Sequence, residues 1–413
     1  MTRLLLLSNG HGEDLSGALL GRQLLGQPGL EIAALPLVGH GEPYRQAGIP
    51  VLGRTRSFST GGLGYTSLRG RLTELLQGQV LYLLRQLRRL WRQRRRTDLV
   101  VIVGDVVPLL AWWVTGLPGV VYLVAYSSHY EGRLRLPWPC GWLLQRRRMR
   151  QVWSRDALTA TDLSQQLGRP VSFLGNPFLD LVVAQPGEAA PEPSPPGGAG
   201  APQRVALLPG SRLPEARQNL ELMLRLLTRL PAPLQRPGRL RLQAALVREL
   251  ASDDLAALAE RLDWRLVGSV LERGDLRLEL VWGGFAAVLR PADLVVAMAG
   301  TATEQAVGLG KPVLQLAGQG PQFTAGFAEA QRRLLGPGVV CAAGEVGASA
   351  TLEASAGLVE QLLATLADPS EGPELRRRLD QVGRERIGTA AGTERMAAAI
   401  MAALPPDPAP RHG

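Results

Sequence analysis

Short apolar runs alternate with segments of helix length along the first half of the chain. The run at 4–7 precedes a stretch at 15–25 whose apolar positions follow helical spacing, and similar runs recur up to residue 174. Buried strands that alternate with helices are typical of a parallel sheet covered by helices on both faces. The predicted strands are 4–7, 31–36, 99–103, 120–125, 157–160 and 171–174.

The same alternation returns in the second half after a break. Residues 186–202 are dominated by Pro, Gly and Ala, from which no core can be built, so we interpret them as a linker or insertion. We therefore expect an α/β protein with two doubly wound domains. The later strands are predicted at 205–208, 240–245, 277–280, 293–297 and 312–316, with helices at 219–230, 255–262 and 303–309. The domains are predicted at 1–185 and 203–375, followed by terminal helices at 376–404 and a tail at 405–413.

One apolar stretch is long enough to cross a bilayer. Residues 106–126 are 21 positions without a charged side chain. Pro118 and Gly119 would break a helix in the middle, and arginines flank both ends, which gives no orientation signal. A short helix over 108–115 between two strands fits the pattern better, with a membrane span as the alternative.

Composition excludes several protein classes. Of the 413 residues, 46% are hydrophobic and 20% charged, which rules out wholesale disorder. The only two cysteines, Cys140 and Cys341, exclude a disulfide scaffold and a cysteine-rich metal module. The formal net charge is +10, and Lys311 is the only basic residue that is not arginine. A positive surface favours an anionic partner: a membrane face, a nucleic acid or a phosphorylated substrate.

The loop after the first predicted strand carries titratable side chains between glycines. Glycines at this place let the backbone approach a ligand at the carboxyl edge of the sheet. His11 could take a proton from a substrate hydroxyl or belong to a polar turn, whereas for Asp14 capping of the next helix is favoured. The spacing is not GxGxxG, so a dinucleotide fingerprint is absent. The loop residues singled out are Gly10, His11, Gly12, Glu13 and Asp14.

Three loops of the second half suit a phosphate and a sugar. A strand runs into Gly210, Ser211 and Arg212, which offer a backbone amide, a hydroxyl and a guanidinium to a phosphate. Small residues follow the strand at 293–297 and begin a helix, whose N–H groups and dipole favour an anion. Glu304, expected in the first turn of that helix, could accept hydrogen bonds from sugar hydroxyls. The turn at 318–323 could bind sugar hydroxyls or be an ordinary turn.

The order and spacing of these motifs resemble the GT-B glycosyltransferases. They are most similar to lipid-A-disaccharide synthase and to a set of related proteins of cyanobacteria, and similar pieces occur in the undecaprenyl-linked N-acetylglucosaminyltransferase of peptidoglycan synthesis. The resemblance implies two Rossmann-like domains facing a cleft, with a UDP-sugar in the C-terminal half and the acceptor in the N-terminal half. The pieces that carry it are 9–17, Ser-Phe-Leu-Gly-Asn-Pro-Phe-Leu-Asp at 172–180, 208–212, 299–304 and Gly-Lys-Pro at 310–312.

The resemblance also implies individual roles. Arg212, with Gly210 and Ser211, would meet the diphosphate, and Asn176 would lie at the domain boundary. The chain departs from the synthase pattern in the 10–14 loop and after the central strand, where only Asp105 remains of two aspartates. The other implied donor-site residues are Gly300, Thr301 and Thr303 around the phosphates, Glu304 at the ribose and Gln322 at the donor sugar.

The residue pattern bears on metal dependence and on the catalytic base. The sequence contains no Asp-x-Asp, and its four histidines are scattered, so Arg212 and the helix start at Thr301 are expected to meet the leaving-group charge without a metal. His11 and Asp105 follow predicted strands of the acceptor half. Because an unperturbed imidazole is mostly neutral at pH 7, His11 ranks first as the base, and Asp105 second.

Two basic stretches carry tryptophans. Residues 85–96 contain seven arginines on Leu/Trp spacing, and residues 138–153 combine tryptophans with four arginines. Such stretches suit an anionic membrane surface, or they are solvated helix faces of an arginine-rich chain. Nucleic acid is not expected, because aromatic content is 5% and no recognised module occurs.

We therefore expect a cytoplasmic hexosyltransferase, peripheral at the inner membrane, that moves a sugar from a UDP-sugar to a lipid or lipid-linked acceptor without a cofactor. One alternative is a non-hydrolysing UDP-sugar 2-epimerase, which shares this fold and needs paired acid–base carboxylates that the sequence does not identify. The other is a non-catalytic relative that binds a nucleotide-sugar or a lipid.

Overall fold

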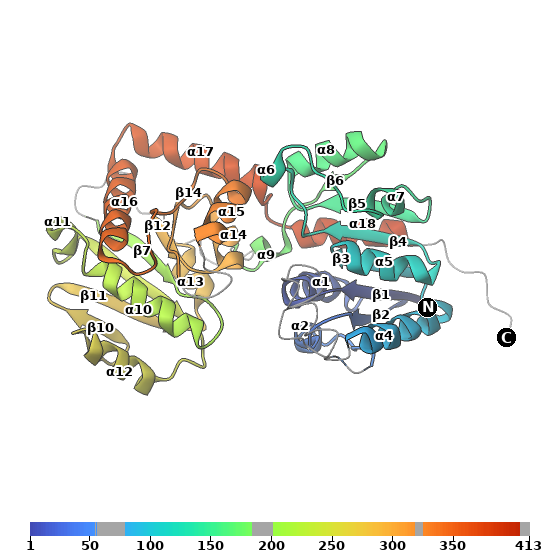
Figure 1. The fold of residues 1–413 in the computed structure, drawn as a ribbon, viewed down its shortest axis with the longest axis horizontal. Coiled ribbons are helices and arrows are strands. Elements are labelled where there is room, and N and C mark those ends of the chain that lie inside the picture. The colour runs from blue at the N-terminus through green and yellow to red at the C-terminus, as the bar shows by residue number, and fades with distance from the viewer. Residues whose placement is uncertain (54, 56–78, 184–200, 319–324, 405–413) are drawn as a thin grey trace. The chain divides into compact units, whose positions relative to one another are not determined.

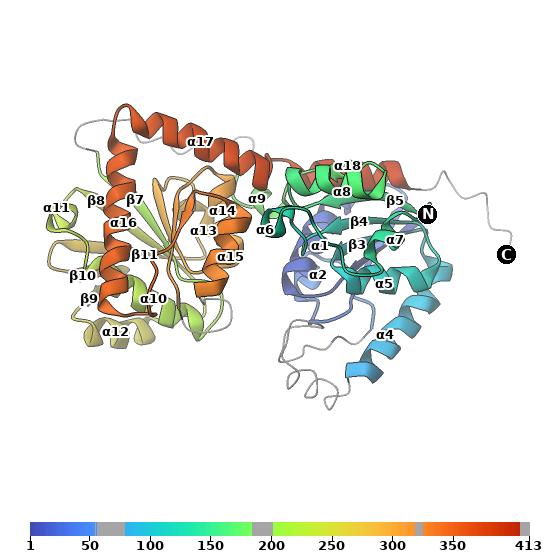
Figure 2. The ribbon, with the colours of Figure 1, turned by 45° about the horizontal axis from the view of Figure 1, so that its top comes forward.

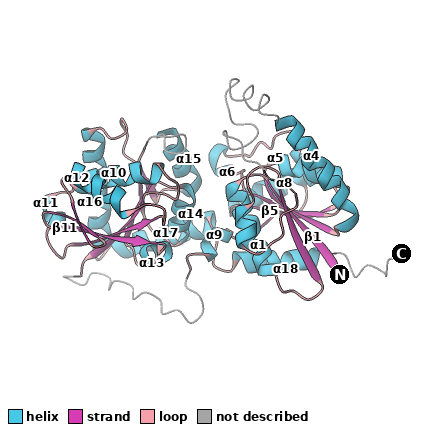
Figure 3. Ribbon diagram, turned by 90° about the horizontal axis from the view of Figure 1, so that it is seen from below, coloured by secondary structure: helices cyan, strands magenta, loops and turns pink. Residues whose placement is uncertain are grey.

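The computed structural model describes residues 1–53, 55, 79–183, 201–318 and 325–404. The chain divides into two compact units. The N-terminal unit comprises Met1–Pro177 and Ala391–Gly413, and the C-terminal unit comprises Phe178–Ala390. In both units helices flank the strands on either side (Figure 3), which confirms the predicted α/β class.

The sheet of the N-terminal unit has six parallel strands in the order β2-β1-β3-β4-β5-β6. β1 lies between β2 and β3, so the chain first adds a strand on one side of β1 and then continues on the other. The gap between the carboxyl ends of β1 and β3 is therefore the topological switch point, where α/β sheets bind their ligands. The strands are β1 (Thr2–Ser8), β2 (Leu30–Pro36), β3 (Leu99–Gly104), β4 (Gly119–Leu123), β5 (Met149–Ser154) and β6 (Ser172–Phe173).

Helices cover both faces of this sheet, because alternate strand residues point to opposite sides. Leu5 and Leu7 of β1 join the core with residues of α4, α5 and α7, whereas Leu4 and Leu6 join the core with residues of α1, α2 and α18. Figure 1 labels these helices around the sheet. α18 comes from the far end of the chain and is tied to β5, since Gln151 Nε2 donates to the Ala399 carbonyl at 3.1 Å. The helices are α1 (His11–Leu24), α2 (Glu42–Gln46), α4 (Gln79–Gln93), α5 (Val106–Thr115), α6 (Ser128–Glu131), α7 (Cys140–Leu144), α8 (Ala157–Leu167) and α18 (Gly392–Ala403), with a 3₁₀ turn at Arg94–Arg96.

The sheet of the C-terminal unit has eight strands in the order β14-β13-β12-β7-β8-β11-β10-β9. The strands from β14 to β11 are parallel, and β10 and β9 extend the edge in antiparallel fashion. Here β7 lies between β8 and β12, so the switch point is between β7 and β12. The strands are β7 (Gln203–Leu208), β8 (Leu240–Leu246), β9 (Arg265–Val267), β10 (Val270–Arg273), β11 (Leu276–Trp282), β12 (Leu294–Ala297), β13 (Val313–Gln315) and β14 (Val339–Val340).

Leucine and valine side chains form the core of this unit. Leu207 of β7 and Val296 of β12 pack with Leu220 of α10 and Val359 of α16, and α10 and α16 lie against each other on this face of the sheet (Figure 2). The helices between residues 177 and 390 are α9 (Pro177–Asp180), α10 (Glu215–Leu227), α11 (Ala232–Gln235), α12 (Ser252–Arg261), α13 (Phe285–Leu289), α14 (Gly300–Gly308), α15 (Ala325–Leu335), α16 (Ser349–Ala367) and α17 (Glu371–Arg386).

Two expectations about local structure need comment. The strand predicted at 157–160 is wrong: these residues begin α8, and the strand is β5. The reason is Asp156, whose carboxylate accepts a hydrogen bond from the Thr159 N–H at 2.8 Å and caps the helix. The apolar stretch at 106–126 forms α5 and β4. Within the described residues, no helix is both long and apolar enough to span a membrane. Residues 186–200 of the predicted linker and the tail at 405–413 lie outside the described residues.

Candidate functional site

A buried hydrogen-bond chain fixes the loop after β1. The Tyr44 hydroxyl donates to Ser8 Oγ at 2.8 Å, and Ser8 Oγ donates to Asp14 Oδ1 at 2.6 Å. The N–H groups of Gly10 and Gly41 also donate to the Asp14 carboxylate. Burial raises the pKa of Asp14 to about 7, although these donors act in the opposite direction. The network therefore anchors the loop between β1 and α1.

This arrangement corrects the expected role of Asp14. The N-cap of α1 is Gly10, and no side chain caps the helix. The helix begins at His11, so Asp14 already lies inside it. Its carboxylate accepts hydrogen bonds from the loop backbone and does not act as the N-cap of the helix. The side chain of His11 lies outside the described residues. Gly12 has open space where a side chain would stand.

Two carboxyl groups meet at the switch point between β1 and β3. Glu13 Oε2 accepts a hydrogen bond from the Asn9 N–H at 2.8 Å, which turns the side chain back over the end of β1. A Cβ atom on Gly104, the last residue of β3, would lie 2.7 Å from the Glu13 carboxyl group. Gly104 also has φ +140°, so only glycine is compatible with both the backbone and the carboxyl group. Asp105 follows directly and is 6% exposed.

Asp105 is held by donors from both loops. Its Oδ1 accepts from the Val107 N–H at 2.8 Å, as the N-cap of α5, and the Asn9 side chain donates a second hydrogen bond. Asn9 Oδ1 is itself buried and accepts no hydrogen bond from the described residues. A buried acceptor beside two carboxyl groups is suited to a hydroxyl-bearing ligand.

Burial raises the pKa of both carboxyl groups. Burial raises the pKa of Glu13 to about 8, and the charge of Asp105 raises it further. Burial also raises the pKa of Asp105, against the effect of its hydrogen-bond donors. The charge of Asp105 thus favours the protonated form of Glu13. An ionised carboxylate at this site can accept a proton from a hydroxyl.

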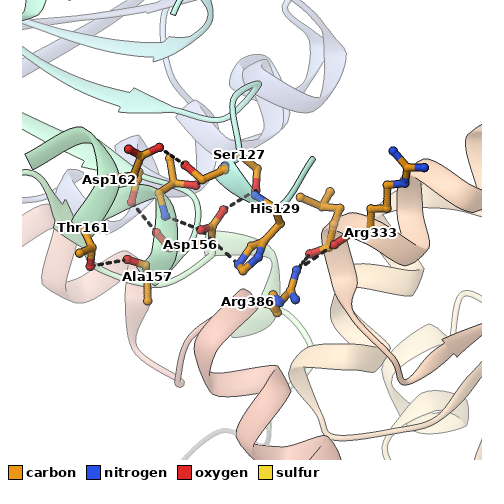
Figure 4. Close-up of polar contacts among 12 residues, drawn as sticks. Ser127, His129, Asp156, Ala157, Thr161, Asp162, Arg333 and Arg386 are labelled. Carbon is orange, nitrogen blue, oxygen red and sulfur yellow. Dashed lines mark hydrogen bonds and ion pairs between the residues drawn. The ribbon is translucent and has the colours of Figure 1, made fainter. Parts of the chain in front are cut away.

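A second polar cluster, not anticipated from the sequence, follows β4 and β5 (Figure 4). His129 Nε2 lies 3.5 Å from Asp156 Oδ1, and Ser127 Oγ donates to Asp156 Oδ2 at 2.7 Å. Asp156 is buried and also caps α8. Ser128 Oγ donates to Asp162 Oδ2 at 2.7 Å. Because β4 and β5 are neighbours, the cluster lies on the same carboxyl edge as Asp105.

The two phosphate loops predicted for the C-terminal unit are neighbours at its switch point. The Met298 N–H donates to the Leu208 carbonyl at 3.0 Å, which joins the ends of β12 and β7. Gly210 has φ +116°, and a Cβ atom on it would lie 3.5 Å from the Met298 carbonyl oxygen. Asn219 of α10 donates to the Pro209 carbonyl at 2.8 Å and fixes the loop. Ser211 and Arg212 then follow as exposed residues.

α14 begins beside this loop, and no described side chain caps its start. Its N-cap is Ala299, so the first N–H groups are available to an anion. Thr301 is exposed, whereas Thr303 is buried and its hydroxyl donates to the Ala299 carbonyl at 2.6 Å. The helix starts at Gly300, so Glu304 lies beyond the first turn and not within it as expected. The hydrogen bond from the Thr303 hydroxyl to the Ala299 carbonyl spans this first turn, which is formed by residues 300–303.

A residue missed by sequence reasoning lies at the same place. A Cβ atom on Gly300 would be 3.9 Å from the Gln331 side-chain nitrogen, and Gln331 Oε1 is buried without a hydrogen-bond partner among the described residues. No motif marks Gln331, because it is one polar position of the amphipathic helix α15. Gln322, the residue expected at the donor sugar, lies outside the described residues.

Comparison with known proteins identifies the architecture. No family model and no curated protein sequence matches the chain. The structure of the glycotransferase of kitacinnamycin is similar over 98% of this chain and 99% of its own, with a TM-score of 0.58 and 17% identity. The chain has the GT-B fold. Each switch-point site described above therefore belongs to one Rossmann-like unit of a GT-B protein.

Two further structures similar to this chain carry descriptions that do not name a glycosyltransferase. The structure of S. aureus MnaA with UDP covers 99% of both chains, with a TM-score of 0.52 and 14% identity. A putative UDP-N-acetylglucosamine 2-epimerase of Listeria monocytogenes covers 97% of this chain and 96% of its own, with a TM-score of 0.50 and 14% identity. The shared fold is thus used by proteins described as transferases and as epimerases.

Proposed function

We propose that this GT-B protein transfers a hexose from a UDP-sugar to a lipid or lipid-linked acceptor. The observation that carries the proposal is the Glu13–Asp105 pair at the switch point of the N-terminal unit. A glycosyl transfer needs a group that accepts the proton of the attacking hydroxyl, and burial raises the pKa of both carboxyl groups, which makes each a stronger base once ionised. Glu13 thus joins His11 and Asp105 as a candidate base.

The donor is assigned to the C-terminal unit. A diphosphate is a dianionic group that the first N–H groups of α14 and the Arg212 guanidinium can bind together. The hydrogen bond between Met298 and Leu208 places the Arg212 loop next to that helix start. These positive groups can also stabilise the charge of departing UDP, so we propose that transfer needs no metal ion. The UDP in the name of the S. aureus MnaA structure supports this choice of nucleotide.

In the proposed reaction, the acceptor oxygen forms a bond to the anomeric carbon while the bond from that carbon to UDP breaks. The electron pair of the broken bond leaves with UDP, and the hydroxyl proton passes to the carboxylate of the Glu13–Asp105 pair. Asn9 Oδ1 would hold the acceptor before attack, since it is a buried acceptor with no partner among the described residues. Glu304 would bind the ribose hydroxyls.

The acceptor and location are proposed from the surface of the N-terminal unit. α4 exposes Leu84 and Trp91, with exposed fractions of 56% and 46%, among arginines and without a carboxylate. Apolar side chains ringed by arginine suit the interface of an anionic membrane. We propose that the protein is peripheral at the cytoplasmic face of the inner membrane and takes its acceptor there.

Binding and turnover test this proposal separately. Calorimetry with UDP and UDP-sugars measures donor binding, and a panel of lipid acceptors followed by mass spectrometry measures transfer. We expect an acceptor whose mass increases by one sugar residue and the release of UDP. Donor binding without transfer to any acceptor, and without consumption of the sugar, would favour a non-catalytic relative.

The same carboxyl pair gives the epimerase alternative a specific basis. A 2-epimerase needs an acid and a base around its sugar, and Glu13 and Asp105 supply two titratable groups that the sequence did not pair. Incubation with a UDP-sugar and no acceptor separates the two reactions. An epimeric UDP-sugar found by NMR would establish the epimerase, whereas an unchanged donor would exclude it and leave the transferase to be tested with acceptors.

A further inference from the structure

Two arginines are stacked against tryptophans where α5 meets α7. Arg146 Cζ lies 3.5 Å from the centroid of the Trp142 ring, and Arg148 Cζ lies 4.0 Å from that of Trp113 and 4.5 Å from that of Trp112. Trp113 and Trp142 meet edge to face with their centroids 4.7 Å apart. The rings therefore hold both guanidinium groups in fixed planes.

These guanidinium groups have unused hydrogen-bond donors. The Nε atoms of Arg146 and Arg148 are buried and have no partner in the described part of the chain. Arg148 Nη2 donates to the Trp113 carbonyl at 2.7 Å. Within the described residues, Arg146 makes no side-chain hydrogen bond, and neither arginine pairs with a carboxylate. Burial and the charge of Arg146 both lower the pKa of Arg148, which is the effect expected of two cations without a counter-ion.

The surroundings are apolar and exposed. Leu110 and Val114 lie on the same face of α5 as Trp113, one turn apart, and are 41% and 44% exposed. Trp138, two residues before α7, is 91% exposed, and Trp142 is 46% exposed. Neither α5, α7 nor the turn at 145–148 contains an acidic residue. Exposed apolar side chains around the arginines add nothing to the binding of a soluble anion. A lipid headgroup, in contrast, has acyl chains beside it that tryptophan and aliphatic side chains can contact.

We propose that Arg146 and Arg148 form a binding site for the phosphate of an anionic lipid headgroup, with Trp138, Trp142 and Leu110 entering the membrane interface around it. A guanidinium fork binds phosphate oxygens through paired hydrogen bonds, and stacking on the rings lowers the entropy lost on binding. The inference rests on the proposed membrane association, and it is independent of the transfer reaction. Binding at this site requires arginine in the protein and phosphate in the lipid, whereas a purely electrostatic attraction requires only opposite charges.

The chain offers a matched control next to the site. Arg147 is exposed, and its side chain has no hydrogen bond or ion pair within the described residues. Arg146→Lys and Arg147→Lys both conserve net charge, but only the first removes a stacked fork. Co-sedimentation with vesicles of equal parts phosphatidylglycerol and phosphatidylcholine measures binding. We expect Arg146→Lys to weaken binding about tenfold or more, as loss of a charged hydrogen bond does, and Arg147→Lys to leave it unchanged.

Equal binding of the two variants would overturn the site while leaving membrane association intact. Wild-type protein that does not bind these vesicles would instead contradict the proposed membrane association itself. Thermal unfolding of both variants at the wild-type temperature is expected, because Arg146 holds no other group through a hydrogen bond in the described residues.

Two further measurements use the unaltered protein and so do not depend on a variant that folds. Vesicles in which oleate replaces phosphatidylglycerol at equal surface charge should bind more weakly, and equal binding would show that phosphate is not recognised. Free glycerol 3-phosphate should not displace the protein from phosphatidylglycerol vesicles at matched phosphate concentration. Displacement would show that the ligand is a soluble phosphate compound and not a lipid.

Discussion

Replacing Glu13 by glutamine should stabilise the protein at alkaline pH while it weakens catalysis. The carboxyl group of Glu13 is wedged against Gly104 and beside the Asp105 charge, so ionising it in the folded state is costly. Its pKa moves from 4.5 in the unfolded chain to about 8 in the folded protein. Since one pKa unit corresponds to about 1.4 kcal/mol, the full cost approaches about 5 kcal/mol.

The sign of the pH dependence follows from proton binding. Between pH 4.5 and about 8 the folded protein holds a proton on Glu13 that the unfolded chain has released, so the free energy of unfolding falls as pH rises through this window. Glutamine is always neutral and can still accept the hydrogen bond from the Asn9 N–H. The difference in stability between Glu13→Gln and wild type should therefore grow from near zero at pH 4.5 to several kcal/mol at pH 9.

Urea unfolding at a series of pH values measures this difference. Glu42→Gln is the matched control, because it makes the same substitution at an exposed glutamate of the neighbouring helix α2. Asp14, whose pKa is also raised, titrates in both proteins, and its charge is one of the smaller causes of the Glu13 shift. If Glu13→Gln kept the wild-type pH profile, Glu13 would not be the strained carboxyl group described here, and its candidacy as a base would fall with it.

Three further predictions concern the donor, the metal and the membrane. Arg212→Ala should weaken UDP binding by about 1.5–3 kcal/mol in calorimetry, as loss of a charged hydrogen bond to phosphate does, and equal affinity would remove Arg212 from the donor site. UDP binding and transfer should persist in EDTA; activity that is lost on chelation and restored by Mg²⁺ or Mn²⁺ would show that a metal ion takes the leaving-group charge. Binding to anionic vesicles should fall as salt rises, since each arginine near the surface contributes about 1 kcal/mol that salt screens, and binding that resists salt and needs detergent for release would argue for inserted segments.

The sequence predicted the strands that are buried on both faces. β1, β3 and β12 are uninterrupted apolar runs, because a parallel strand between two helical layers has no polar side. β5 was missed because Arg150 and Gln151 interrupt it, and both side chains donate to the backbone of α18, which comes from the far end of the chain. That contact could not be anticipated from local pattern.

The sequence predicted those parts of the candidate site that follow apolar strands directly. The loops after β1, β7 and β12 were recognised from their glycines and their place after apolar strands. The pairing of Glu13 with Asp105 was not, because it joins residues 92 positions apart and depends on β1 and β3 being neighbours. His129 with Asp156 is a similar case. The Arg146–Trp142 stack lies within a segment that the sequence marked only as basic and tryptophan-rich.

The most direct test of the central claim is the product of the reaction. Wild-type protein and Asp105→Asn are incubated with a UDP-sugar and a panel of lipid acceptors, and UDP and glycosylated lipid are quantified by mass spectrometry. We predict that the wild type forms UDP and glycosylated lipid in equal amounts, and that Asp105→Asn binds the donor normally but turns over ~10²–10⁴-fold more slowly. An acceptor-independent epimer of the donor, or no change in any UDP-sugar that binds, would contradict the proposal of sugar transfer.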